Sequence, residues 1–180
     1  TTFTGQDGLS QSVVIAMAQG PQGYLWIGTQ AGLNRFGGQG FEVFDVAEGL
    51  SDPRVQALLS VPNVGLLVGT QHGLDILRDG RFEPFGAPRG LKPGRIYRLV
   101  QTSDGTIWCG TEHGLAQLKR GRFIYFDGIQ TEVRGVLAAR DGSLWGTSSG
   151  VGLWHIKNGR LRQIEGPPKV GLPALAEGPA

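Results

Sequence analysis

Short apolar segments alternate with turn residues along the chain, and one of these segments returns at a fixed interval. Residues 25–29, 66–70 and 107–111 each hold three apolar residues followed by Gly-Thr, and they start 41 residues apart, at 25, 66 and 107. A looser copy at residues 144–147 follows 37 residues later. No stretch of useful length shows the 3.6-residue spacing of an amphipathic helix. The pattern therefore predicts a repeated unit of short β-strands.

Each repeat unit contains four short apolar segments separated by turn signals. In the third unit the predicted strands are residues 96–101, 106–110, 115–118 and 123–126, with Asp104-Gly105 in the first turn. Asp-Gly and Asn-Gly pairs favour two-residue hairpins in which both central residues have positive φ, and similar pairs recur at Asp79-Gly80, Asp141-Gly142 and Asn158-Gly159. Four antiparallel strands in about 40 residues, repeated, predict an all-β fold built from β-propeller blades.

The repeat divides the chain into about four four-stranded blades, which we interpret as part of a larger propeller. The blade units are residues 13–45, 54–86, 95–127 and 132–165, with the tail of a preceding blade at 1–3 and the start of a fifth at 172–180. A closed ring of four blades is the alternative, but it leaves the fifth strand unplaced. Uncovered blade edges favour association, so we expect this segment to form an open arc or to associate with itself.

Composition excludes several classes of protein. Glycine accounts for 31 of the 180 residues, well above the usual share of roughly 7%, and the glycines follow the repeat rather than a Gly-X-Y period. Hydrophobic residues make up 39% of the chain, too many for a disordered tail. The single cysteine, Cys109, excludes an internal disulfide. The net charge of +2 with scattered basic residues predicts no nucleic-acid partner, and no apolar run is long enough to contact or span a membrane.

The most regular side chains of the repeat are predicted to hold neighbouring blades together. Trp26, Trp108 and Trp145 occupy one position on the second strand, where the second unit has Leu67. Such tryptophans could stack on a ligand, but a large residue at fixed phase is also what blade stacking requires, and we favour the packing interpretation. The glycine at the end of the second strand permits close approach of the backbone. The glycines of this position that we assign a structural role are Gly28, Gly69 and Gly110.

Loops at one end of the blades carry the candidate ligand-binding residues. The first strand of a blade lies nearest the propeller axis, so Arg54 and Arg95, one repeat apart, are expected near the mouth of the central channel. The complete predicted set is Arg54, Gln56, His72, Arg95, Tyr97, His113 and Arg134. Long hydrogen-bonding side chains of this kind suit an oligosaccharide or a small anionic ligand. The alternative is a solvated rim without a ligand.

Catalytic chemistry has little support in the sequence. His72 and His113 share a repeat position, and with Glu112 they could approach a metal site, but the sequence does not place three ligands in a suitable geometry. No Ser-His-Asp order, phosphate-binding loop or zinc-binding helix motif is present. We therefore predict no catalytic residues, no metal and no cofactor.

Several segments resemble the two-component regulator propeller repeat. They are Gly49-Leu50-Ser51, Gly23-x-Leu25-Trp26-Ile27-Gly28-Thr29, Gly32-Leu33-Asn34-Arg35-Phe36 and Gly40-Phe41. The resemblance covers about residues 1–176, although the second unit has Val64 and Leu67 where the repeat has glycine and tryptophan, and the fourth lacks the residue between Trp145 and Gly146. It implies a seven-bladed propeller in the periplasmic or extracellular sensor region of a bacterial hybrid histidine kinase, or of a diguanylate cyclase or another signalling protein. In glycan-sensing members of the family, the ligand is an oligosaccharide breakdown product.

The sequence thus favours a non-catalytic module of a two-component-type sensor that binds an oligosaccharide or a small anion. The expected partners are that ligand, other propeller blades or a second copy of the chain, and a downstream signalling domain in the full-length protein. Two alternatives stay open. One is an enzyme of the streptogramin-lyase type, whose propeller repeats look similar and which uses a central histidine. The other is a protein-interaction scaffold with an empty channel.

Overall fold

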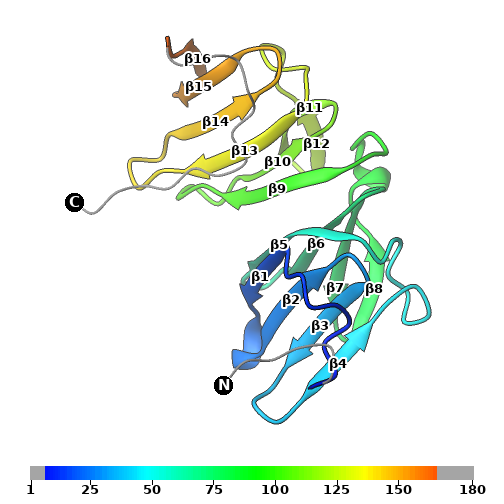
Figure 1. Cartoon of the computed structure of the whole chain (residues 1–180). Coiled ribbons are helices and arrows are strands. Elements are labelled where there is room, and N and C mark those ends of the chain that lie inside the picture. The colour runs from blue at the N-terminus through cyan, green and yellow to red at the C-terminus, as the bar shows by residue number, and fades with distance from the viewer. Residues whose placement is uncertain (1–6, 166–180) are drawn as a thin grey trace. The chain divides into compact units, whose positions relative to one another are not determined.

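The computed structural model describes residues 7–165, which fold into two compact units (Figure 1). Within the described residues the first unit comprises 7–88 and the second 89–165. The blade tail expected at residues 1–3 and the fifth blade expected to start at 172–180 lie outside the described residues.

The first unit consists of two antiparallel sheets of four strands each. One sheet has the order β1 (Ala16–Gln19), β2 (Leu25–Thr29), β3 (Gly32–Phe36) and β4 (Phe41–Phe44). The other has the order β5 (Val55–Val61), β6 (Gly65–Thr70), β7 (Leu74–Arg78) and β8 (Arg81–Pro84). The first strands of the two sheets, β1 and β5, contact each other. This meander of sequential strands confirms the predicted four-stranded blades.

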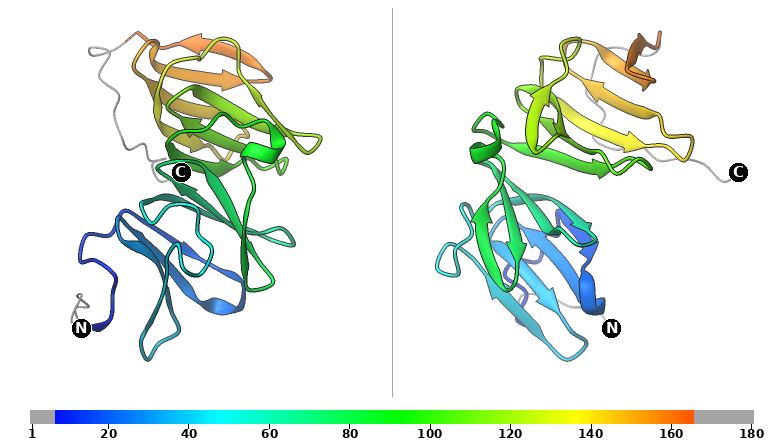
Figure 2. Two further views of the ribbon diagram at one scale, coloured as in Figure 1. Left: turned by 90° about the vertical axis from the view of Figure 1, so that its right-hand side faces the viewer. Right: turned by 180° about the vertical axis from the view of Figure 1, so that it is seen from behind.

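The second unit repeats this architecture. Its sheets run β9 (Ile96–Gln101), β10 (Ile107–Thr111), β11 (Gly114–Lys119), β12 (Arg122–Tyr125) and β13 (Val133–Ala138), β14 (Leu144–Ser148), β15 (Gly152–Lys157), β16 (Arg160–Gln163). The first strands β9 and β13 again contact each other (Figure 2). Besides the strands there are two short 3-10 turns, η2 (Pro21–Gly23) and η3 (Ala87–Arg89). Within residues 7–165 no helix is long and apolar enough to cross a membrane.

Two kinds of hairpin turn join the strands, where the sequence predicted one. Between the third and fourth strands of the second, third and fourth blades both central residues have positive φ, as at Asp79 and Gly80 (51° and 76°). This is the expected two-residue hairpin. Between the first two strands of the third blade only Gly105 has positive φ, at 84°. There the Asp104 carboxylate accepts hydrogen bonds from Thr106 N (3.0 Å) and Thr102 Oγ1 (2.6 Å), so the side chain organises a longer turn.

The two blades of a unit pack closely where a valine of the second blade of the unit lies against a glycine of the first. In the first unit, a Cβ added to Gly28 would lie 2.5 Å from Cγ1 of Val55, so only glycine leaves room for the valine. In the second unit, a Cβ on Gly110 would lie 2.7 Å from the carbonyl oxygen of Val133. Trp26 and Trp108 belong to the hydrophobic clusters at these two junctions and are buried.

The fourth blade departs from this packing. Trp145 is half-buried and stacks on His155, with the ring centroids 4.3 Å apart. The tryptophan buried in the core is instead Trp154 on β15, which is 0% exposed. Gly146 lies opposite Trp154 in the strand pair, and a Cβ on Gly146 would collide with the indole ring. The glycine that follows Trp145 directly therefore makes the space that Trp154 fills.

Candidate functional site

The predicted ligand-binding residues fall in both units, and in each unit some of them form a cluster of contacting side chains. Arg54, Gln56 and His72 belong to the first unit, and Arg95, Tyr97, His113 and Arg134 to the second. A repeated backbone hydrogen bond fixes their loops: the residue after the second strand donates to the carbonyl of Arg54, Arg95 or Glu132, each at 3.1 Å. Glu132 therefore occupies the position that holds arginine in the two preceding blades.

A buried carboxylate organises the first-unit cluster. Asp52 Oδ1 accepts hydrogen bonds from the backbone N and Nε of Arg54 at 2.8 and 3.1 Å, and Oδ2 accepts one from Nη2 at 2.9 Å. Nδ1 of His72 also contacts Oδ2 of Asp52 and lies 3.3 Å from Nη2 of Arg54. The Asp52 side chain is 5% exposed, whereas those of Arg54 and His72 are 43% and 63% exposed. Asp52 thus holds two solvent-facing side chains in place.

The charge of this cluster follows from the environment of Asp52. Burial raises the pKa of its carboxyl group, but hydrogen bonds from Arg54 and His72 outweigh burial and lower that pKa to about 2. The same ion pair raises the pKa of Arg54. Asp52 is therefore ionised at neutral pH and neutralises the charge of Arg54. Gln56 on β5 is half-buried and makes no hydrogen bond to these three side chains in the described part of the chain.

The second-unit cluster is built around a tyrosine ring. The guanidinium carbons of Arg95 and Arg134 lie over the Tyr97 ring, at 5.5 and 5.4 Å from its centroid. The Tyr97 hydroxyl donates to Oε1 of Glu132, and Nη2 of Arg134 pairs with the same oxygen at 3.1 Å. Cation–π contacts of this kind orient guanidinium groups while leaving their N–H donors available. The cluster thus presents two arginines beside one carboxylate.

Protonation states in this cluster are set by the same contacts. Burial and the adjacent Glu132 raise the pKa of Tyr97, so its hydroxyl is neutral and remains a donor. Burial raises the pKa of Glu132, but hydrogen bonds from Tyr97 and Arg134 outweigh it and lower that pKa. With Glu132 ionised, the two arginines give the cluster a net charge of +1. This differs from the first-unit cluster, in which Asp52 neutralises the charge of Arg54.

His113 lies outside the tyrosine cluster. Its Nε2 is 2.7 Å from the carbonyl oxygen of Pro93 and 3.3 Å from Oε1 of Glu112. Both predicted histidines are placed by the same local turn, because Thr70 Oγ1 and Thr111 Oγ1 accept the backbone N–H of His72 and His113. They share a loop position but have different partners: a buried carboxylate for His72, a carbonyl and an exposed glutamate for His113.

The two carboxylates that organise the clusters were not in the predicted set. Asp52 and Glu132 each precede an arginine by two residues, in Asp52-Pro53-Arg54 and Glu132-Val133-Arg134. Alternate residues of an extended segment point to the same side, so this spacing is a signal that could have identified them. Within residues 7–165 no group of three histidine, cysteine or acidic side chains is arranged to hold a metal ion. Cys109 is fully buried, which raises the pKa of its thiol.

Comparison with known proteins identifies the repeat. The family model of the two component regulator propeller matches residues 8–31 and 90–113. A histidine kinase of Formosa agariphila is 51% identical over 43 residues, which is 24% of this chain and 3% of the kinase. The chain therefore spans a small fraction of the length of this relative.

Solved structures share the fold at low sequence identity. The extracellular domain of a hybrid two-component system from B. thetaiotaomicron superposes with a TM-score of 0.80 at 19% identity, over 94% of this chain and 27% of that one. Virginiamycin B lyase of Staphylococcus aureus superposes with a TM-score of 0.67 at 14% identity, over 86% of this chain and 56% of the lyase. At these identities the likeness shows the propeller fold and nothing about activity.

Proposed function

The two-component regulator propeller repeat is present in this chain, at residues 8–31 and 90–113, and from this premise we propose that the chain is part of a sensor propeller that binds a ligand without transforming it. In the full-length protein, the propeller would lie on the periplasmic or extracellular side of the bacterial inner membrane. There it would report ligand binding to a signalling domain, a histidine kinase or another output. The expected ligand is an oligosaccharide or a small anion.

The second-unit cluster is the observation that carries this proposal. Arg95 and Arg134 are held over the Tyr97 ring, and Glu132 balances one of the two charges. Guanidinium groups match carboxylate and phosphate oxygens in a bidentate manner, while a tyrosine hydroxyl and a carboxylate can bind sugar hydroxyls. The Arg134 side chain is 51% exposed, so a ligand can reach it without unfolding the loop. This combination suits a hydroxyl-rich ligand that carries a negative group.

Binding should be tested by calorimetric titration of the chain with a panel of neutral and acidic oligosaccharides, phosphate and small carboxylates. We expect saturable binding of at least one member of the panel. Arg95→Ala should weaken the affinity for that ligand about tenfold or more, which corresponds to a loss of roughly 1.4 kcal/mol in binding free energy. Arg160→Ala is the matched control, because Arg160 is an exposed arginine of the same unit at the hairpin between β15 and β16. Equal losses for both variants would reject the site.

The signalling role needs the complete protein. In a reporter strain that expresses the full-length gene, the ligand found by titration should change output, and the Arg95→Ala variant should shift that response to higher ligand concentrations. If Arg95→Ala reduces ligand binding to the chain but leaves the response of the reporter strain unchanged, ligand binding at this site does not drive signalling. Protease accessibility in intact spheroplasts would test the proposed side of the membrane.

A further inference from the structure

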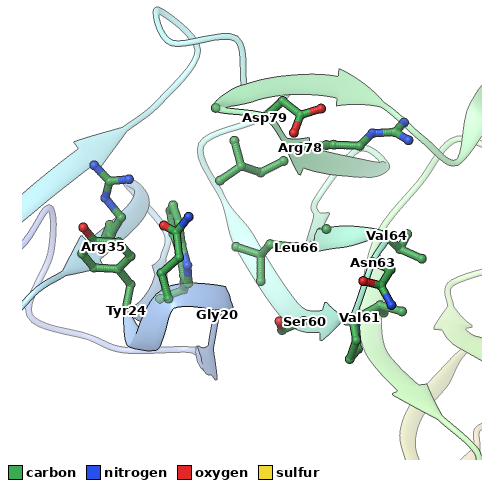
Figure 3. Close-up of a pocket in the computed structure, with 16 residues that line it drawn as sticks. Gly20, Tyr24, Arg35, Ser60, Val61, Asn63, Val64, Leu66, Arg78 and Asp79 are labelled. Atoms are coloured by element: carbon green, nitrogen blue, oxygen red, sulfur yellow. The ribbon is translucent and has the colours of Figure 1, made fainter.

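A pocket of about 820 Å³ lies between the two sheets of the first unit (Figure 3). It is formed by the hairpins at the ends of β1 and β5 and by the hairpin between β7 and β8. Arg54 directly precedes β5, whereas Ser60 and Val61 of this pocket end it, so pocket and Asp52 cluster lie at opposite ends of one strand. The pocket is therefore distinct from the proposed ligand cluster.

The floor of the pocket is apolar and its rim is polar. Trp26 and Leu66 are buried and belong to the hydrophobic cluster of the unit, and Leu77 packs against that cluster. The rim carries exposed side chains with hydrogen-bonding groups: Gln22, Asn63, Arg78 and Asp79. In Figure 3, Tyr24 and Arg35 lie on one side of the pocket, and Leu66, Asn63 and Asp79 on the other. A volume of this size and an apolar lining with few polar groups are typical of small-molecule sites.

Gly20 packs closely against the indole edge of Trp26. The backbone at Gly20 is extended, with φ −84° and ψ 174°, a conformation that any residue can adopt. Glycine is needed here for space, because a Cβ would collide with Nε1 and Cδ1 of Trp26. Both residues line the pocket. A side chain at residue 20 would therefore displace the indole ring and change the shape of the pocket.

The cations of the pocket already have anionic partners. Arg35 pairs with Glu42, and Arg78 lies 3.9 Å from Glu83. The Arg35 guanidinium also lies over aromatic rings, 4.8 Å from the Tyr24 centroid and 5.8 Å from that of Trp26. With these pairs made, Asp79 leaves a surplus of one negative charge around the pocket. The pocket is therefore poorly suited to an anion and offers a carboxylate to a ligand that donates hydrogen bonds.

We propose that this pocket binds a neutral aromatic molecule that carries hydrogen-bond donors at its edge. Its ring would extend the stack formed by Arg35, Tyr24 and Trp26, with its apolar face toward Leu66. Its donors would reach Asp79 and the amide oxygens of Gln22 and Asn63. The proposal does not depend on the proposed sensor function, because it uses a different end of the blades and a different ligand chemistry.

Indole is a suitable probe, because it is a neutral aromatic ring with one N–H donor. The ¹⁵N-labelled chain would be titrated with indole while the side-chain N–H signals of its four tryptophans are observed. Trp26→Phe assigns the signal of Trp26. We expect a saturable shift of that signal at millimolar indole, with the signals of Trp108, Trp145 and Trp154 unchanged.

Substitutions at the pocket distinguish a bound ligand from loose association. Gly20→Ala should abolish the saturable shift, and Gly40→Ala is its control, because a Cβ on the exposed Gly40 would meet nothing within 4 Å. Asn63→Gly keeps the folded backbone, since Asn63 has a φ of 61°, and removes one rim amide. Tyr24→Ala removes the stacking ring and should weaken indole binding by up to about tenfold.

Three results would overturn the proposal. One is the absence of a saturable shift with indole, and a second is an equal shift in the wild type and in both Gly20→Ala and Tyr24→Ala. The third is a saturable shift with methyl glucoside but none with indole, since the ligand class would then be a sugar rather than an aromatic ring. If Gly20→Ala fails to fold, Asn63→Gly and Tyr24→Ala still decide the question.

Discussion

One repeat position on the third strand of the blades holds buried polar residues in the first unit and buried apolar residues in the second. In the first unit this position holds Asn34 and Asp75, which are 0% and 2% exposed. Each is tied to a serine of the loop that leads into the first strand of its own blade: Asn34 to Ser10 N and Oγ, both at 2.8 Å, and Asp75 to Ser51 N and Oγ, at 2.9 and 2.6 Å. The first unit thus anchors its loops through buried polar side chains.

In the second unit the same position is apolar. It holds Ala116 and Trp154, both 0% exposed, and Lys92 stands where the first unit has a serine. The Lys92 N–H instead reaches the hydroxyl of Tyr125 at 3.2 Å. Trp154 Nε1 is buried without a hydrogen-bond partner among the described residues, so its contribution is one of packing.

The difference shows which constraint the repeat imposes. The strand pairing is the same in all four blades, with Asn34, Asp75, Ala116 and Trp154 lying opposite Ile27, Val68, Cys109 and Gly146. The third strand can carry a large buried residue where the paired residue of the second strand is glycine, as Trp154 does opposite Gly146. The strand pairing is therefore the same in each blade, while the volume and polarity of the side chains at the paired positions differ between blades.

The largest effect is expected at Trp154, the large apolar residue at this position in the second unit. Trp154→Ala removes a fully buried indole and leaves a cavity, so we expect a loss of about 3–5 kcal/mol in the free energy of unfolding of the second unit. Urea unfolding followed by amide NMR signals of each unit would measure it. Trp145→Phe, at a half-buried stacked position, should cost less than about 1 kcal/mol. Similar losses for both would mean that Trp154 does not fill the core as described.

The valine-over-glycine junctions should respond differently in the two units. Gly28→Ala is expected to cost about 1–3 kcal/mol by overpacking, and Val55→Ala should offset part of this cost, because the clash is with the valine side chain. Gly110→Ala should not be relieved by Val133→Ala, because the Val133 backbone carbonyl lies closest to the added Cβ. Double-mutant cycles would measure both couplings. Equal coupling at the two junctions would contradict this distinction.

A smaller effect is expected at the buried carboxylate. Asp75→Asn should stabilise the first unit by about 1 kcal/mol at neutral pH, because the amide can bond Ser51 as Asn34 bonds Ser10, without a buried charge. Burial raises the pKa of Asp75, so the folded state binds its proton more tightly than the unfolded state. Stability should therefore rise as the pH falls toward about 4, and Asp75→Asn should remove this rise. Urea midpoints measured against pH would show no such rise if Asp75 is not the cause.

The smallest effect is expected at Asp52. Its pKa is lowered to about 2 in the folded chain, so its stabilising contribution is present above the unfolded value near 4 and is lost as the pH falls toward 2. Asp52→Asn should reduce stability at neutral pH by no more than about 1 kcal/mol, since Arg54 and His72 are largely exposed. It should also flatten the acid limb of the stability curve. An unchanged acid limb would contradict the ion pairing.

Much of the fold could be predicted from the sequence, because the period and the turn residues are local signals. The 41-residue spacing locates all the strands of the first three blades, and Asp79-Gly80 behaves as the hairpin rule requires. The role of Trp154 could not be predicted. It depends on the side chain that Gly146 lacks across the strand pair, which is a tertiary relation outside the repeat pattern.

The candidate site was predictable in its cations and less so in its geometry. Repeat position indicated Arg54, Arg95, Tyr97 and Arg134, and the structure brings the last three together. The sequence did not indicate that Asp52 neutralises Arg54, because burial decides the strength of that pair. The pocket between the first two blades was also missed, since its residues come from three hairpins and share no motif.

The difference between the two arginines tests the proposed function most directly. With the ligand found by titration, affinities would be measured for Arg54→Ala and Arg95→Ala in the same chain. Arg54 is bound to a buried carboxylate, whereas Arg95 lies over a neutral ring, so Arg95→Ala should weaken binding about tenfold and Arg54→Ala by less than about threefold. A larger loss for Arg54→Ala, or no loss for Arg95→Ala, would contradict the assignment of the second-unit cluster as the ligand site.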